Sequence, residues 1–113
     1  MTEFQGLLLS VAVEAPVAWL LAALTRWPSR GAGHVAAAAA VATAVTHPQL
    51  WAAAAWLMPQ FGWPTTAAAG EAAVVIVEGL LIAWMARMRP GQAMLVSLCA
   101  NTASFVVGLL VTG

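Results

Sequence analysis

The sequence predicts an all-α membrane protein with four transmembrane helices in an up-down-up-down bundle. Of its 113 residues, 63% are hydrophobic and only 7% are charged. An average soluble domain carries about 25% charged residues, so this chain lacks the polar surface that water requires. Apolar stretches of roughly 20 residues, the length that crosses a bilayer, follow one another along almost the whole chain. We therefore treat residues 1–113 as a single integral membrane domain.

Four apolar segments have this length, and short turn-forming segments separate them. The predicted spans cover residues 4–27, 35–58, 66–87 and 92–111. The breaks run from Pro28 to Gly33, from Pro59 to Pro64 and from Arg89 to Gly91, and all contain proline and glycine. Connections this short place each helix antiparallel to the next, which predicts the up-down-up-down order.

A short internal similarity offers a second description of the same bundle. Val13 and Glu14 in the first span correspond to Val77 and Glu78 in the third, and each pair precedes an apolar stretch with tryptophan and arginine. Two such units inserted in the same sense would form a parallel repeat, as in some transporters. The bundle is then two tandem helical hairpins.

The arginines predict the orientation. Arg26 and Arg30 flank the first break, Arg87 and Arg89 flank the third, and the second break has no basic residue. Because Lys and Arg are retained on the cytoplasmic side, we expect both termini on the outer face of a bacterial inner membrane.

The composition also excludes several functions. The formal net charge is zero and there is no basic patch, which argues against nucleic-acid binding. Cys99 is the single cysteine, so no disulfide forms within the chain. It has no His or Asn beside it on its own helix to activate it as a nucleophile, and the chain contains no Asp. We therefore do not expect an enzyme.

Each predicted span carries one strongly polar residue near its centre. These residues are Glu14, His47, Glu78 and Asn101. At about 1.5 Å of rise per residue, all four lie within a few ångström of one bilayer depth. A charge at a helix centre costs roughly 2.5–3.5 kcal/mol on insertion scales, so these side chains are expected to point into the bundle.

Three further residues extend this predicted polar layer. Glu71 lies seven residues before Glu78 and therefore shares its helical face, about two turns nearer the outside. Thr43 lies four residues before His47, and Ser104 lies three residues after Asn101. We expect these three as secondary members of the site.

The polar layer has three interpretations. A divalent metal ion such as zinc, iron or manganese would take Glu14, His47 and Glu78 as ligands, with Asn101 as a further donor. A proton path would use Glu71, Glu78, His47 and Glu14, which form a staggered series from the outer side to the midplane. In the third interpretation, the polar groups only hold helices together by hydrogen bonds.

The predicted function is accordingly a small membrane protein whose midplane site binds a proton or a metal cation in transport. The alternative is an accessory or assembly subunit of a larger membrane complex, in which the polar layer serves helix packing. A bundle of this size is too small to enclose a wide pore alone. Its expected partners are therefore the lipid bilayer and either further copies of itself or a larger membrane complex.

Several short motifs carry a resemblance to a known group. They are Thr46 with His47 and Pro48, the glutamates of the third span, and Asn101 followed by Ser104. In these features the chain resembles small bacterial four-span membrane proteins of unassigned function. The resemblance implies a four-span fold and brings no biochemical role with it.

Overall fold

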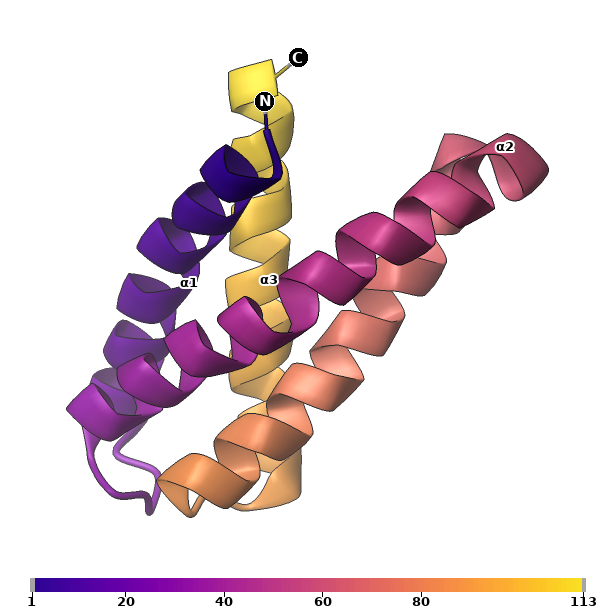
Figure 1. The fold of residues 1–113 in the computed structure, drawn as a ribbon. Coiled ribbons are helices and arrows are strands. Elements are labelled where there is room, and N and C mark those ends of the chain that lie inside the picture. The colour runs from indigo at the N-terminus through magenta and orange to yellow at the C-terminus, as the bar shows by residue number, and fades with distance from the viewer. Residues whose placement is uncertain (1, 113) are drawn as a thin grey trace.

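The computed structural model describes residues 2–112 and contains three helices in that part of the chain (Figure 1). Helix α1 spans Glu3–Thr25, α2 spans Ala32–Ala86 and α3 spans Pro90–Thr112. Each is long and apolar enough to cross a membrane. This supports the prediction of an all-helical membrane protein.

The predicted number of helices is wrong. The spans expected at residues 4–27 and 92–111 correspond to α1 and α3 to within two residues at each end. The spans expected at 35–58 and 66–87 are instead parts of one 55-residue helix, α2. A bundle of four separate helices therefore does not describe this structure.

Helix α2 folds back on itself at Gly62. A straight helix of 55 residues would be about 83 Å long at ~1.5 Å per residue, whereas the longest dimension of the molecule is 42 Å. Gly62 has φ 79° and ψ 169°, a conformation open almost only to glycine, and it is the non-helical residue inside α2. One residue thus reverses the chain where the sequence predicted a six-residue loop from Pro59 to Pro64. We call residues 32–61 the first arm of α2 and residues 63–86 its second arm.

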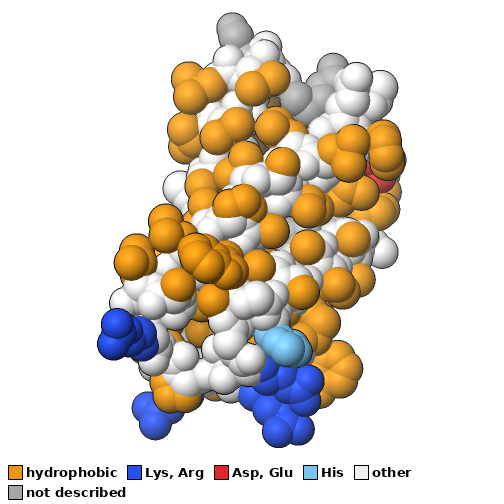
Figure 2. Space-filling model, turned by 90° about the vertical axis from the view of Figure 1, so that its left-hand side faces the viewer, with side chains coloured by type: hydrophobic (Ala, Val, Ile, Leu, Met, Phe, Trp, Pro, Cys, Tyr) orange, Lys and Arg blue, Asp and Glu red, His pale blue; other side chains and the backbone are white. Residues whose placement is uncertain are grey.

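The reversal brings both chain ends to one end of the bundle, as Figure 1 shows. The four arginines occupy the other end, because they lie in the two connections between helices. Arg26 and Arg87 cap α1 and α2 in the left-handed conformation, and the Arg30 amide donates to the Ala86 carbonyl at 2.8 Å, which ties the first connection to the end of α2. Figure 2 shows the basic side chains gathered at this end, below a face of apolar side chains.

Large apolar side chains lie outside the bundle, and small ones lie inside. Leu110 is 78% exposed and Trp84 is 77% exposed, whereas most of the buried apolar residues are alanines. This arrangement suits a lipid environment, because helices in a bilayer associate through close packing of small residues. Near the arginine end the core contains a cluster of buried apolar residues, which we call the arginine-end cluster. Its buried members are Ala18, Ala22, Val35, Ala38, Ala39, Ile82, Ala86, Met88, Ala93 and Val96.

Helix α3 approaches the second arm closely at Gly79. A Cβ atom at Gly79 would lie 2.5 Å from the sulfur and 3.2 Å from the Cα of Met94. Further from the arginine end, the Ser97 hydroxyl donates to the Val75 carbonyl at 2.8 Å. These contacts fix the register of α3 against the second arm, which places Asn101 beside Glu78.

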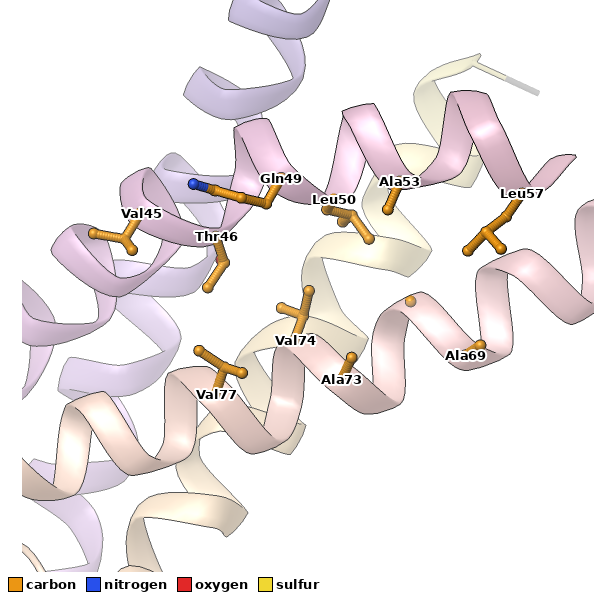
Figure 3. A pocket seen from close by; sticks show the side chains of 11 residues that line it. Val45, Thr46, Gln49, Leu50, Ala53, Leu57, Ala69, Ala73, Val74 and Val77 are labelled. Atoms are coloured by element: carbon orange, nitrogen blue, oxygen red, sulfur yellow. The ribbon is translucent and has the colours of Figure 1, made fainter.

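An apolar groove of about 450 Å³ lies between the two arms of α2 on the turn side of this contact (Figure 3). Side chains from both arms line the groove, among them Val45 and Leu57 from the first arm and Ala73 and Val77 from the second. Thr46, Leu50 and Val74 line this groove and also the interior cavity described next.

Candidate functional site

A small cavity lies inside the bundle and is bounded by all three helices. Its volume is about 70 Å³, room for about two water molecules at roughly 30 Å³ each. We call it the glutamate cavity. It is lined by Ser10, Glu14, Thr43, Thr46, His47, Leu50, Glu71, Val74, Glu78, Asn101 and Ser104. The structure therefore brings every residue of the predicted polar layer around one cavity.

Glu78 on the second arm is the most strongly held carboxyl group. Its Oε2 lies 2.6 Å from the Thr46 hydroxyl, and its Oε1 lies 3.3 Å from the Thr43 hydroxyl and 3.3 Å from Nδ2 of Asn101. The side chain is only 2% exposed. Three polar groups from the first arm and α3 thus converge on this one carboxyl group.

The two threonines can serve Glu78 in either protonation state. The Thr46 hydroxyl also lies 3.0 Å from the Ala42 carbonyl, and the Thr43 hydroxyl lies 2.9 Å from the Ala39 carbonyl. A hydroxyl has one hydrogen and two acceptor lone pairs. Each threonine can therefore donate to a Glu78 carboxylate, or donate to its own helix and accept a hydrogen bond from a protonated Glu78.

Asn101 is oriented by its own helix. Its Nδ2 donates to the Ser97 carbonyl at 2.8 Å, which leaves the second hydrogen for Glu78 Oε1 or for the Ser97 hydroxyl at 3.2 Å. Ser104 donates its hydroxyl to the Asn101 carbonyl at 3.1 Å. Asn101 is thus a positioned donor toward the cavity.

Glu14 on α1 also lines the cavity, and its surroundings differ from those of Glu78. The side chain is 2% exposed, yet its Oε1 is buried with no hydrogen-bond partner within residues 2–112. A buried polar atom without a partner costs about 1–3 kcal/mol. None of the residues that line the cavity is a Lys or an Arg. Oε1 of Glu14 therefore lacks a hydrogen-bond donor within residues 2–112, and no cationic side chain is among the residues that line the cavity.

His47 faces the cavity but is engaged by a neighbour on its own arm. The Trp51 indole N–H donates to Nε2 of His47 at 3.2 Å, and the two rings lie 5.9 Å apart. Because Nε2 accepts, a neutral imidazole carries its hydrogen on Nδ1, and Nδ1 is buried without a partner within residues 2–112. Gly6 of α1 packs on these rings, where a Cβ would lie 3.3 Å from Trp51 and 3.4 Å from His47.

Glu71 lies at the edge of the cavity nearer Gly62 and is half-buried. The predicted metal ligands Glu14, His47 and Glu78 all line the cavity, but residues 2–112 contain no group of three or more His, Cys, Asp or Glu side chains placed to hold a metal ion. The glutamate cavity thus offers carboxyl, hydroxyl and amide groups for hydrogen bonding.

Sequence reasoning named Thr46 only in the motif with His47 and Pro48 and did not place it in the polar layer, although it makes the shortest contact with Glu78. It lies three residues after Thr43 and next to His47, so its position on the polar face of the first arm was available as a signal. It also missed Trp51 as the partner of His47, although an indole four residues further along a helix reaches the same face.

The comparisons with known proteins add nothing to this geometry. No family model, no curated protein and no solved structure matches the chain.

Proposed function

We propose that the glutamate cavity binds a proton between Glu14 and Glu78, and that the protein uses this site to move protons within the membrane. One observation carries the proposal: two buried carboxyl groups from different helices line a cavity that has no cationic side chain among its lining residues. Two carboxylates in such a place repel each other strongly, and a proton shared between them removes one of the two charges.

The hydrogen bonds around Glu78 support a site that both takes up and releases a proton. The hydroxyls of Thr43 and Thr46 reach both Glu78 and carbonyl oxygens of their own helix. Rotation of two hydroxyl groups therefore adapts the site to a charged or a neutral Glu78 without movement of the backbone. Proton relays in membrane proteins are commonly built from such Asp, Glu and His side chains.

A proton fits the arrangement better than a divalent metal ion. Divalent metals in proteins take several ligands at about 2.0–2.6 Å, and His is a frequent one. Here Nε2 of His47 accepts from Trp51, and the Glu78 oxygens accept from Thr46, Thr43 and Asn101. The donors that would serve a metal are thus already engaged with one another.

Infrared spectroscopy of the protein in mild detergent tests the binding of the proton. The C=O stretch of a protonated carboxyl group is followed as the pH is raised, in the parent protein and in the variants Glu14→Gln and Glu78→Gln. We expect a band that disappears with pH in the parent and is altered in each variant. The exposed Glu3→Gln variant is the control, and it should leave that band in place. A parent spectrum without a titrating buried carboxyl group contradicts the proposal.

Proton movement is tested separately in vesicles. The protein is reconstituted with a pH-sensitive dye inside, and a potassium gradient with valinomycin drives protons inward. We expect a proton flux in the parent and in Glu3→Gln, and its loss in Glu78→Gln. Equal fluxes in all of these preparations and in empty vesicles would instead favour the packing role expected of an accessory subunit.

A further inference from the structure

We propose that Glu71 is the proton-access residue of this site on the side of the Gly62 turn, connecting water there to Glu78 and Glu14. This inference rests on the proposed proton-binding function. It assigns to a third glutamate the role of passing protons.

The position of Glu71 is the first argument. It lies seven residues before Glu78 on the second arm, which places it on the same helical face about 10 Å nearer the Gly62 turn. It lines the glutamate cavity together with Glu14 and Glu78. Glu71 is therefore the carboxyl group of the cavity that lies nearest the turn.

The surroundings of Glu71 are the second argument. Glu71 also lines two surface grooves: one between the second arm and α3, where Phe105 stacks on Trp63, and one between the two arms beneath the Gly62 turn. Among residues 2–112, no other polar residue lines both the cavity and one of these grooves. The Glu71 carboxyl group makes no hydrogen bond to residues 2–112, which leaves its oxygens free for water.

The groove between the two arms beneath the Gly62 turn contains a second polar group that lacks a hydrogen-bond partner. Thr66 is 7% exposed, and its hydroxyl oxygen is buried without a hydrogen-bond partner within residues 2–112. Thr66 and Glu71 line this groove together. A water molecule held by Thr66 would stand between the turn and Glu71, because buried waters typically satisfy such unpartnered groups.

The other direction is bordered mainly by apolar residues. Toward the arginines the core consists of the arginine-end cluster, in which Ala18, Val35 and Ala86 are fully buried. All the titratable groups that face the cavity, which are Glu14, His47, Glu71 and Glu78, lie on the turn side of this cluster. Beyond the cavity on the arginine side, Ser97 is fully buried and its hydroxyl donates to the Val75 carbonyl, and Oε1 of Gln92 is buried without a partner within residues 2–112. Neither side chain is titratable, whereas Glu71 on the turn side is.

The test is the rate at which the buried carboxyl groups exchange their proton for deuterium, followed by the infrared shift of their C=O band after mixing into heavy water. We expect Glu71→Gln to keep the pH-titrating band of the glutamate cavity and to slow its exchange by about tenfold or more, as for removal of a proton-transfer group. Glu71→Asp, which keeps a carboxyl group, should restore most of the rate. Glu3→Gln is the matched control and should exchange like the parent.

The two proposals fail in different ways in this experiment. If the parent has no titrating band, the proton site itself is wrong. If the band titrates normally but Glu71→Gln exchanges within twofold of the parent, the site stands and the role of Glu71 is overturned. A surviving band in Glu71→Gln also shows that the variant has folded, so a slow rate cannot come from unfolding.

Discussion

The hydroxyl oxygen of Thr46 lies 2.6 Å from Oε2 of Glu78 and 3.0 Å from the carbonyl oxygen of Ala42. One hydrogen is thus placed between a carboxyl group on the second arm of α2 and a backbone carbonyl on the first arm. Without this hydroxyl, the Ala42 carbonyl would accept only its helical hydrogen bond, and the Glu78 carboxyl group would lose its shortest contact. The pairing joins the two arms where the chain carries its most buried polar groups.

Thr46→Val should weaken the contact between the two arms of α2 while keeping the shape of the side chain. We expect the free energy of unfolding to fall by about 0.5–2 kcal/mol, the range of hydrogen bonds between helices in membranes and of bonds to charged groups. Unfolding in mixed detergent measures it. Thr112→Val is the control, because Thr112 is exposed and its hydroxyl donates only to Gly108 of its own helix. An equal loss in both variants would show that Thr46 acts only within its helix.

Gly62→Ala should disturb the reversal of α2. The conformation at φ 79° and ψ 169° costs a residue with a side chain about 1–3 kcal/mol, although no atom lies within 4 Å of the position of a Cβ. Gly108→Ala is the matched control, because Gly108 is helical and its Cβ position is equally free. We expect a lower unfolding free energy for the first variant, and an unchanged or slightly higher one for the second. Similar values for both would mean that the reversal does not depend on Gly62.

Glu14→Gln and Glu78→Gln should differ in their effect on stability. Oε1 of Glu14 makes no hydrogen bond within residues 2–112, so its replacement by Gln removes no existing hydrogen bond at that atom. Glu78 accepts from three donors, so its replacement disturbs existing hydrogen bonds. At neutral pH we expect Glu14→Gln to be neutral or stabilising and Glu78→Gln to cost about 1–3 kcal/mol. The opposite order would contradict the assignment of Glu78 as the held carboxyl group.

The shared proton also predicts how the stability of the parent and of Glu14→Gln depends on pH. Raising the pH removes the shared proton and leaves two like charges in one cavity, so the parent should lose stability as the pH rises above neutral. Glu14→Gln leaves a single carboxyl group and should lose less over the same range. Unfolding curves at several pH values measure the difference. A parent that gains stability with rising pH would rule out the shared proton.

The four arginines predict the side of the membrane on which each end of the bundle lies. They gather at the end opposite the chain termini, and that end is expected to stay in the cytoplasm. Alkaline phosphatase fused after residue 113 should therefore be active in the periplasm, and green fluorescent protein fused there should be dark. The reverse result would place the arginine end outside.

The sequence predicted the membrane class and the ends of α1 and α3, because apolar length and composition are properties of the chain alone. It also predicted which polar residues share one depth, since the rise of a helix converts residue spacing into distance. The number of helices could not be read in this way. Proline and glycine between residues 59 and 64 indicate a reversal, but not that a single backbone conformation at Gly62 completes it within α2.

Only the tertiary structure decided which polar groups meet. Glu14 and Glu78 look alike in the sequence, each following a valine in an apolar stretch. In the structure Glu78 has three partners and Glu14 Oε1 has none within residues 2–112. The difference arises from the rotation of each helix about its axis and from the close approach of Gly79 to Met94, which sets the position of α3. Spacing along a chain determines depth and face, whereas the partner of a buried carboxyl group depends on how neighbouring helices pack.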